Sequence, residues 1–263
     1  MTDSAALHSE LLAGRRLVVV GAGFIGLEVA ATARELGLAV TVVEIASTPL
    51  ARALGPDAGA WFQRRHASHG IDFRCGTTVG RIEPSGLGAR VDLSDGSILD
   101  ADLVLAGVGV SPTTGWLAGS GLDIRDGVVC DSSLRTGLPG VVAAGDVARW
   151  HDRRFGQELR VEHWRNALEQ GRHAARTILG SDEPFTQMPY FWSDQLDAKI
   201  QSVGIPHDAD CAEVQRLDDT SLAVVYGRQG VVRGALCVNA PRDLVRYRRA
   251  VEEQVAWADV ATA

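Results

Sequence analysis

The sequence predicts an α/β protein whose first part is a Rossmann-like domain with an inserted β-meander. Three observations lead to this fold class. Residues 16–44 read as strand, glycine turn, helix and strand without a break, and they end on an acidic residue. Short apolar stretches then alternate with longer segments of helical periodicity. The 263 residues are 46% hydrophobic, enough for one large domain or two modest ones, each with its own core.

The first segment, to about residue 120, is expected to form a βαβαβ unit. The helix predicted over 24–36 carries apolar residues on one face and stops at Gly37. A second helix is predicted over 55–69 and a third strand over 71–75. Three short alternating stretches around a Ser-Asp-Gly turn predict the meander, and a continuously apolar strand closes the unit: 79–82, 89–93, 97–99 and 102–107.

The remaining elements are fewer and shorter. Two strands and a helix are expected in the middle of the chain: 127–130, 140–144 and 162–179. Three strands and a closing helix are expected after the Ser-Asp-Glu-Pro stretch at 181–184: 199–203, 222–226, 231–238 and 242–257. No apolar run is long enough to span a bilayer, and the start lacks the order of a secretory signal. A cytoplasmic location without a membrane partner is therefore expected.

The charge distribution and the cysteine spacing argue against a nucleic-acid-binding protein and against a metal site. The net charge is −7, and the arginine clusters over 149–176 and 242–249 are diluted by acidic residues, which argues against nucleic acid as a partner. These clusters fit either a docking face for an acidic protein or ordinary solvated helix faces. The four cysteines show no CxxC and no metal-ligand spacing, so no metal site is predicted.

The glycine turn at residues 21–26 (Gly-Ala-Gly-Phe-Ile-Gly) is the main candidate for cofactor binding. In such a turn the first glycine permits the tight bend, the second lets the backbone approach a pyrophosphate, and the third lets helix pack close on strand. The helix N-terminus offers free N–H groups to the phosphates. The candidate residues are Gly21, Gly23, Phe24, Ile25 and Gly26. A glycine turn with no ligand is the alternative.

Glu44 indicates which dinucleotide binds. It ends the second strand, near the offset expected for a carboxylate on a ribose 2′-hydroxyl. The same carboxylate would repel a 2′-phosphate, so NAD is favoured over NADP.

Five stretches carry a family resemblance: VVVGAGFIGLEVAATAREL, GVGVSPTT, VVAAGDVA, RVEHWRNALEQG and YFWSDQ. The C-terminal run GVVRGALCVNAPRDL adds to them. On these motifs the chain resembles the NADH-dependent ferredoxin reductases of the putidaredoxin-reductase type, FAD enzymes of the pyridine nucleotide–disulfide oxidoreductase superfamily. The resemblance implies three parts: an NAD-binding domain (1–120), the C-terminal part of an FAD-binding domain (121–180) and a small α+β domain (181–263).

The resemblance also implies that the chain lacks the family's N-terminal FAD-binding segment. Strands near Val128 and Val141 are then expected to lack partners and to expose apolar edges. A homodimer is one way to complete such a segment.

Site residues follow from the resemblance one by one. Gly21, Gly23 and Gly26 are expected at the NAD pyrophosphate, and Glu44 and Arg52 at the adenosine end. Nicotinamide-side positions are Glu28, Gly107 and Gly109. Flavin-side positions are Asp146 at the ribityl chain, Val147 at a helix start, and Glu162, Trp164 and Trp192 near the isoalloxazine and the electron exit. Alternatives stay open: Glu28 as a solvated residue, Arg52 as a surface arginine, and the two tryptophans as core aromatics.

Three functions remain. The first is an FAD-dependent oxidoreductase that passes electrons from NADH to a ferredoxin-type iron–sulfur protein; with no redox cysteine pair, electrons would leave the flavin singly. The second is a flavin-free NAD-binding module without catalytic activity. The third is an ordinary NAD dehydrogenase, for which we find no acid–base residues directed at a substrate.

Overall fold

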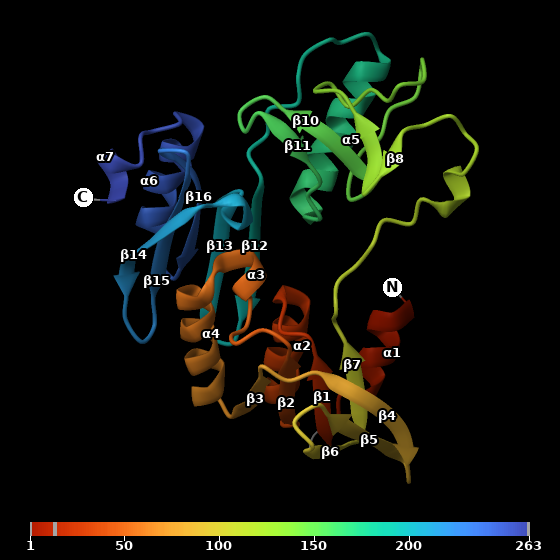
Figure 1. The fold of residues 1–263 in the computed structure, drawn as a ribbon, viewed down its shortest axis with the longest axis vertical. Helices are drawn as coiled ribbons and strands as arrows, with labels where there is room; N and C mark the ends of the chain where they lie inside the picture. The colour runs from red at the N-terminus through yellow and green to blue at the C-terminus, as the bar shows by residue number, and fades with distance from the viewer. Residues whose placement is uncertain (1, 13–14, 262–263) are drawn as a thin grey trace.

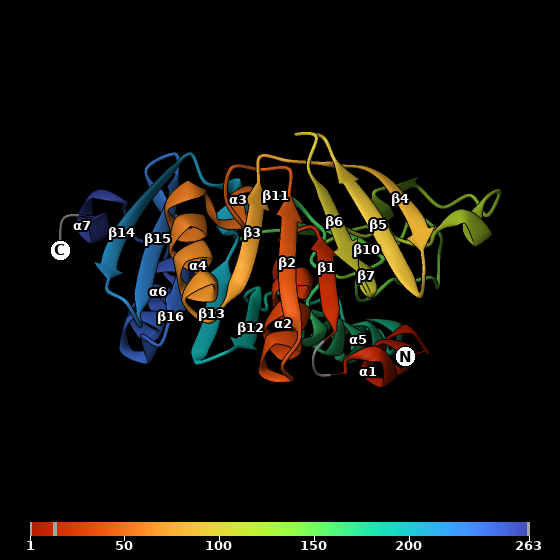
Figure 2. The ribbon, with the colours of Figure 1, turned by 90° about the horizontal axis from the view of Figure 1, so that it is seen from below.

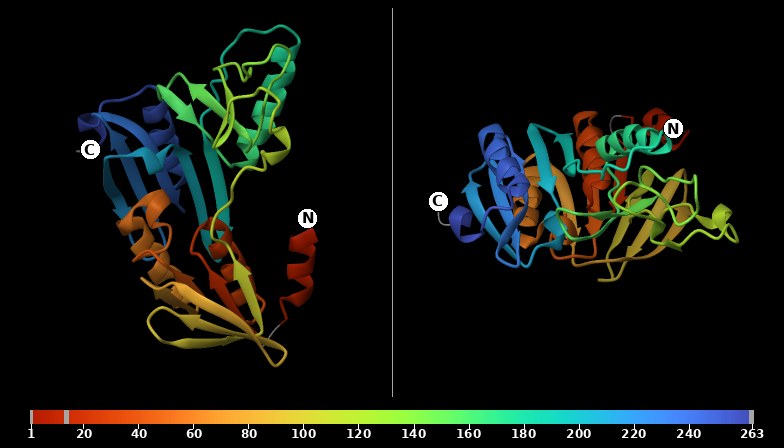
Figure 3. Two further views of the ribbon diagram at one scale, coloured as in Figure 1. Left: turned by 45° about the vertical axis from the view of Figure 1, so that its right-hand side comes forward. Right: turned by 90° about the horizontal axis from the view of Figure 1, so that it is seen from above.

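The computed structural model describes residues 2–12 and 15–261. The N-terminal segment occupies one end of the long axis and the middle segment the other, with the C-terminal segment alongside (Figures 1 and 3). Single stretches of chain connect the three: one rises from β7 to β8, and another descends from α5 to β12. The α/β fold predicted from sequence is confirmed.

The N-terminal unit is a parallel four-stranded sheet in the order β3-β2-β1-β7. Its strands are β1 (Arg16–Val20), β2 (Ala39–Glu44), β3 (Ile71–Cys75) and β7 (Leu103–Ala106). Its helices are α1 (Thr2–Glu10), α2 (Phe24–Glu35), α3 (Ala51–Leu54) and α4 (Pro56–Ser68). The inserted meander consists of β4 (Val79–Ser85), β5 (Gly88–Leu93) and β6 (Ile98–Ala101), and Figure 2 shows it beyond β7. The predictions for this unit are confirmed.

The middle segment forms a second sheet in the order β11-β10-β9-β8. Its elements are η1 (Gly115–Leu117), β8 (Ile124–Arg125), β9 (Gly127–Cys130), β10 (Ala148–Asp152), β11 (Gln157–Leu159) and α5 (Trp164–Ile178). The expectation that the strand at Val128 lacks partners is wrong, because β9 lies between β8 and β10. The strand expected over 140–144 is also wrong, since only an isolated bridge joins Val142 to Arg135.

Val147 does not start a helix, contrary to expectation. It precedes β10, whose Ala148 pairs in parallel with Val128 of β9. The Val147 carbonyl accepts the Val128 N–H at 2.7 Å, so the residue is committed to the ladder. The helix of this segment starts only at Trp164.

The C-terminal segment is a five-stranded antiparallel sheet in the order β12-β13-β16-β15-β14. Its elements are β12 (Tyr190–Gln195), β13 (Ala198–Gly204), η2 (Pro206–Asp208), β14 (Cys211–Leu217), β15 (Leu222–Arg228), β16 (Val231–Val238), α6 (Pro241–Glu252) and α7 (Ala258–Ala261). The closing helix ends five residues earlier than predicted, at Glu252, because Gln254 adopts a left-handed conformation with φ +50°.

The C-terminal sheet joins the two other segments because both of its faces are buried. Along β15, Leu222, Val224 and Tyr226 pack into the core shared with the N-terminal unit. The intervening Ala223 and Val225 pack into the core shared with the middle segment. Side chains of a strand alternate between faces, so this one strand contributes to both cores.

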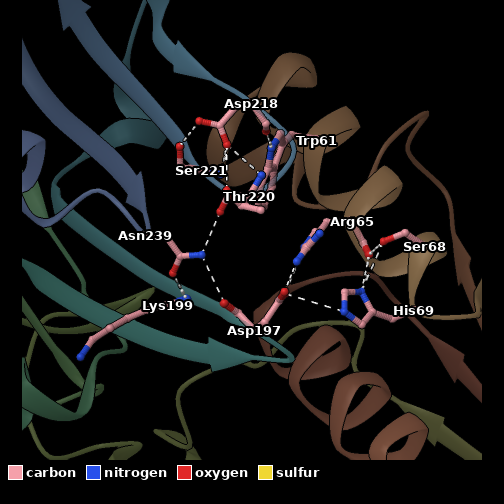
Figure 4. Close-up of polar contacts among 10 residues, drawn as sticks. All are labelled: Trp61, Arg65, Ser68, His69, Asp197, Lys199, Asp218, Thr220, Ser221 and Asn239. Atoms are coloured by element: carbon pink, nitrogen blue, oxygen red, sulfur yellow. Dashed lines mark hydrogen bonds and ion pairs between the residues drawn. The ribbon is translucent and has the colours of Figure 1, made fainter.

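Polar contacts also tie α4 to the C-terminal segment (Figure 4). The Arg65 guanidinium forms a two-pronged ion pair with Asp197 in the turn between β12 and β13. The Trp61 indole N–H donates to the Asp218 carbonyl at 2.8 Å. The Asn239 side-chain amide donates to the Asp197 carbonyl and so holds the same turn from its other side. The β12–β13 hairpin is thereby fixed against α4.

Candidate functional site

The glycine turn combines two closely packed positions with one open one. A Cβ on Gly21, whose φ is +98°, would lie 2.4 Å from the carbonyl oxygen of Gly107. A Cβ on Gly26 would lie 2.1 Å from the Gly21 carbonyl oxygen. A Cβ on Gly23 would meet nothing within 4 Å. Gly21 and Gly26 are therefore required by packing, whereas Gly23 keeps a space free at the helix N-terminus.

The remaining candidate residues, in the glycine turn and in the second turn at residues 107–109, differ in exposure. Phe24 packs edge-on against Phe191 of β12, with ring centroids 4.6 Å apart. Ile25 is exposed on the first turn of α2. Gly109 has φ +105° and open space around it. Ile25 and Gly109 are therefore accessible to a ligand from solvent, while Phe24 anchors the turn to the C-terminal sheet.

Glu44 fixes the shape of the glycine turn. One carboxylate oxygen accepts the Ala22 N–H at 2.7 Å and the other accepts the Ala46 N–H at 2.8 Å. The Leu50 N–H donates to the Ala22 carbonyl at 3.1 Å, which brings the start of α3 to the same turn. Arg52 on α3 is exposed and has no hydrogen bond or ion pair to any residue that the structure describes. A cation and a carboxylate thus flank the turn.

Glu28 is not a freely solvated side chain. It is half-buried on α2, and its carboxylate accepts the Ser193 hydroxyl of β12 at 2.5 Å. The Ser193 oxygen in turn accepts the Gln195 amide N–H at 2.9 Å. Gln195 Oε1 lies 3.0 Å from Nε2 of the buried His66. Glu28 is therefore the end of a polar chain that crosses from α2 through β12 to α4.

The two tryptophans meet at the junction of α5 and β12. Trp164 and Trp192 form an edge-to-face pair with centroids 6.2 Å apart. Their side chains are 71% and 44% exposed, so neither is a core aromatic. A cavity of about 90 Å³ lies beside them, lined by residues 163–165 and 190–192. The junction thus combines exposed aromatic rings with a small cavity, an arrangement suited to contact with a planar ligand.

Asp146 and Glu162 are linked through Arg160. The Arg160 guanidinium donates to the Glu162 carboxylate at 2.5 Å, to the Asp146 backbone carbonyl at 3.3 Å and to Asp126 at 2.9 Å. The Asp146 carboxylate itself is exposed and has no partner among the described residues. The turn is thus held by its backbone, and its carboxylate stays available. Val147 directs its carbonyl into the sheet, so only its N–H side can contribute to binding.

His163, next to Trp164, makes stability depend on pH. Its ring lies 4.8 Å from that of Phe191, its Nδ1 is buried without a partner, and burial lowers the pKa of His163 from 6.5 to about 4. Below pH 6.5 the unfolded chain therefore binds a proton that the folded chain does not, and stability falls as pH drops towards 4. Between pH 7 and 5, the free energy of unfolding of His163→Phe should fall by about 2 kcal/mol less than that of the wild type, measured by urea unfolding.

A control substitution at another histidine tests whether the pH dependence of stability comes from the His163 ring. His151 is exposed, so His151→Gln should leave the pH dependence of unfolding as in the wild type. The pKa of His66 is also lowered by burial, but His66 is present in all three proteins. Equal slopes for wild type and His163→Phe would contradict the expectation.

The structure brings the predicted residues together in two groups. The glycine turn, Glu44, Glu28 and Gly107 form one group, and the two tryptophans with Asp146 and Glu162 belong to the middle segment and its contact with β12. Sequence reasoning missed the partners Ser193, Gln195, His66 and Arg160. Ser193 and Gln195 alternate along β12 and share a buried face, a signal that is readable only once 190–195 is recognised as a strand.

Several negative findings apply to residues 2–12 and 15–261. Within them, no helix is long and apolar enough to cross a membrane. No cluster of three or more metal-ligating side chains occurs in this part of the chain. Cys75, Cys130, Cys211 and Cys237 are free thiols, and burial raises the pKa of Cys130 to about 11 and that of Cys237 to about 12.

Comparison with known families gives two matches along the chain. Residues 1–171 match the family described as pyridine nucleotide-disulphide oxidoreductase. Residues 190–263 match the family described as reductase C-terminal. Together they cover all three segments except residues 172–189, which comprise the C-terminal part of α5 and its connection to β12.

Individual relatives are similar over nearly the whole chain. The ferredoxin reductase subunit of the 5,5′-dehydrodivanillate O-demethylase of Sphingobium sp. (strain NBRC 103272 / SYK-6) is 39% identical over 95% of this chain and 61% of its own length. Putidaredoxin reductase of Pseudomonas putida is 33% identical over 97% of this chain and 61% of its own length. The chain thus spans about three fifths of the length of these relatives.

Two solved structures have a similar fold. A covalent complex of putidaredoxin reductase with putidaredoxin gives a TM-score of 0.91 at 33% identity, covering 97% of this chain and 62% of that one. The ferredoxin reductase for the CYP199A2 system of Rhodopseudomonas palustris also gives 0.91, at 36% identity, covering 99% of this chain and 65% of that one.

Proposed function

The chain belongs to the pyridine nucleotide-disulphide oxidoreductase family, and from this premise we propose that it works in an FAD-dependent reductase that passes electrons from NADH to a ferredoxin-type iron–sulfur protein. The observation that carries the proposal is the contact between an open glycine turn and an exposed aromatic junction. The ring of Phe24 in the turn touches Phe191, next to Trp192, which pairs with Trp164.

The residues of the N-terminal unit fit NAD. The open space at Gly23 lies at the N-terminus of α2, where backbone N–H groups and the helix dipole favour a pyrophosphate. Glu44 supplies a carboxylate and Arg52 an unpaired cation at the adenosine end. Glu28, fixed by Ser193, and the turn at Gly107 complete the side proposed for the nicotinamide.

The residues of the middle segment fit the remaining part of a flavin site. The exposed Asp146 carboxylate has no partner among the described residues and is available to ribityl hydroxyls. Beneath it, Gln170 accepts the Gly145 N–H at 2.8 Å through Oε1, while its buried Nε2 has no partner. The N-terminus of α5 has no side-chain cap, so it offers free N–H groups beside Trp164. These open donors and acceptors support a bound polar group at this turn.

Each part then has a defined task. Bound flavin supplies the chemistry that accepts a hydride from NADH and releases electrons one at a time. The protein holds the nicotinamide through the turn at Gly107 and Glu28, and orients the flavin through Asp146 and Glu162. We propose that the exposed rings of Trp164 and Trp192 cover that side of the flavin and lie at the electron exit.

The proposed acceptor is a ferredoxin-type protein, in keeping with the names of the relatives, and we propose that its docking surface is acidic. Helix α5 supports this choice because Arg165, Arg172 and Arg176 are exposed along it, the first of them next to Trp164. Opposite charge would steer such a partner towards the aromatic junction. Use of NADH and a ferredoxin also favours the cytoplasm as its location. A homodimer remains a prediction that light scattering can test.

We propose three functional parts with boundaries near residues 120 and 180, as expected from sequence. The shared cores on both faces of the C-terminal sheet support one cooperative unit with three tasks rather than three independent domains.

The test is the visible absorption spectrum of the purified chain with and without added FAD, followed by NADH under anaerobic conditions. We expect flavin bands that bleach on addition of NADH, and weaker FAD binding in Asp146→Ala. A colourless chain that still binds NADH would favour the alternative function, a flavin-free NAD-binding module. Reduction of a ferredoxin by the FAD-loaded chain then tests the acceptor.

A further inference from the structure

A continuous hydrogen-bonded chain joins Glu28 to a histidine on another helix. It runs from the Glu28 carboxylate through the Ser193 hydroxyl and the Gln195 amide to His66, at 2.5, 2.9 and 3.0 Å. His66 Nδ1 ends the chain on the Phe62 carbonyl at 2.9 Å. Ser193, Gln195 and His66 are buried, with exposed fractions of 3%, 1% and 0%. Buried side chains this well connected act as one unit.

The donors and acceptors of these contacts determine the direction in which the hydrogen bonds run. The Phe62 carbonyl only accepts, so its contact is a hydrogen bond only when Nδ1 of His66 carries a proton. Gln195 Oε1 also only accepts, so both contacts are hydrogen bonds at the same time only when Nε2 carries a second proton. Gln195 then donates to Ser193, and Ser193 donates its single proton to Glu28. Every contact is satisfied when His66 is an imidazolium and Glu28 a carboxylate.

If the hydrogen bonds run in the opposite direction, His66 and Glu28 must have the opposite protonation states. If Nε2 of His66 is unprotonated, the Gln195 amide must turn to donate to it, and the Ser193 hydroxyl must then donate to Gln195. The Ser193 oxygen now presents a lone pair to Glu28, which has to be protonated to be satisfied. A neutral His66 together with a charged Glu28 leaves two acceptors facing each other somewhere in the buried chain, which is unfavourable.

The other groups around His66 do not stabilise a proton on it in place of Glu28. Burial is the main factor that lowers the pKa of His66, and the charged or titratable neighbours on its own helix, His69 and Arg65, lower it further, so the hydrogen bonds to Phe62 and Gln195 are what favour a charge on this ring. Asp197 of the β12–β13 turn pairs with Arg65 and lies 3.8 Å from His69, so it offsets them (Figure 4). From β3, the ring of Phe73 packs edge-on against the His66 ring. Glu28 has no ion-pair partner among the described residues.

We propose that His66 is a positioning residue: through Gln195 and Ser193 its protonation is coupled to that of Glu28, so that a proton on His66 and a charge on Glu28 stabilise each other. The inference deepens the proposed function, on which the placement of Glu28 at the nicotinamide rests. The nicotinamide ring is cationic in NAD⁺ and neutral in NADH. A carboxylate held in this way favours the oxidised cofactor, and the bound cation in turn favours the proton on His66.

The first experiment needs no cofactor. The protein is labelled with ¹⁵N-histidine, the His66 signals are assigned with His66→Gln, and the ring is titrated by NMR. We expect Ser193→Ala and Glu28→Gln each to lower the pKa of His66 by about one. Ser193→Thr keeps the hydroxyl and should restore the wild-type titration. Ser202→Ala, an equally buried serine on β13, is the matched control and should have no effect.

The second experiment adds NAD⁺ to the same titration. We expect saturating NAD⁺ to raise the pKa of His66 in the wild type and to leave it unchanged in Ser193→Ala. Identical His66 titrations in cofactor-free wild type, Ser193→Ala and Glu28→Gln would overturn the coupling. A coupling seen without cofactor but unaffected by bound NAD⁺ would overturn its link to the nicotinamide. Failure of NAD⁺ to bind would instead count against the proposed function, because the cofactor-free titration does not depend on it.

Discussion

Replacing Gly26 by alanine should destabilise the N-terminal unit and weaken NADH binding, whereas replacing Gly23 should weaken NADH binding at nearly unchanged stability. The new methyl on Gly26 would lie 2.1 Å from the Gly21 carbonyl oxygen, which is backbone and cannot turn aside. Helix α2 would have to move away from β1. Overpacking of this kind costs about 3 kcal/mol, and it displaces the helix N-terminus that is proposed to hold the pyrophosphate.

Gly23 behaves differently because its surroundings are open. Its φ of −75° suits any residue, and a Cβ there meets nothing within 4 Å. We expect Gly23→Ala to keep its stability within about 1 kcal/mol of the wild type. The methyl would occupy the space proposed for the pyrophosphate, so NADH affinity should fall at least about tenfold, which corresponds to 1.4 kcal/mol. Thermal unfolding and NADH fluorescence titration measure the two effects separately.

A glycine outside the site provides the control. Gly171 is exposed in the interior of α5, with nothing within 4 Å of its Cβ position. Gly171→Ala should leave NADH binding unchanged and add up to about 1 kcal/mol of stability, because alanine favours a helix. Wild-type NADH affinity in Gly23→Ala would show that the pyrophosphate does not lie at this turn.

Local pattern was sufficient to predict the N-terminal unit. The strand–turn–helix–strand order of residues 16–44, the second helix and the meander are encoded within short windows, and the parallel pairing of β1 with β2 follows from the connecting helix. Strands β10, β11, β12 and β14 were missed because their polar residues obscure the alternation that marks a strand. β12, for example, reads Tyr-Phe-Trp-Ser-Asp-Gln, and within its polar half Ser193 and Gln195 are buried while Asp194 is exposed.

The candidate site was predicted only as far as its motifs reach. Glu44 could be found from its offset, but its two backbone hydrogen bonds depend on how the turn folds back on β2. Ser193 lies 165 residues from Glu28, and Gln195 lies 129 residues from His66. No periodicity encodes such contacts, because they arise from the docking of the C-terminal sheet on α2 and α4. Val147 was misplaced because its carbonyl accepts the N–H of Val128 in β9, a pairing that the pattern around Val147 does not reveal.

Neutralising Glu44 should relax the choice between the two dinucleotides. In the wild type we expect a strong preference for NADH, because a 2′-phosphate would face a carboxylate fixed by the N–H groups of Ala22 and Ala46. Glu44→Gln removes the charge but keeps one oxygen as acceptor. We expect its preference for NADH over NADPH to fall by about 10- to 100-fold, measured by titration with both cofactors, which is about 1.4 to 2.7 kcal/mol.

Comparison with other variants separates charge from structure at this position. Glu44→Ala leaves the buried Ala22 N–H without a partner and should cost about 1–3 kcal/mol of stability, whereas Glu44→Gln should cost less. Glu35→Gln makes the same chemical change on the exposed end of α2 and should leave cofactor preference unchanged. In the Glu44→Gln background the unpaired Arg52 becomes the main charge near the turn, so adding Arg52→Gln should weaken NADPH binding more than NADH binding. Equal NADPH affinity in wild type and Glu44→Gln would refute the placement of the ribose, because a carboxylate next to a 2′-phosphate cannot be without effect on its binding.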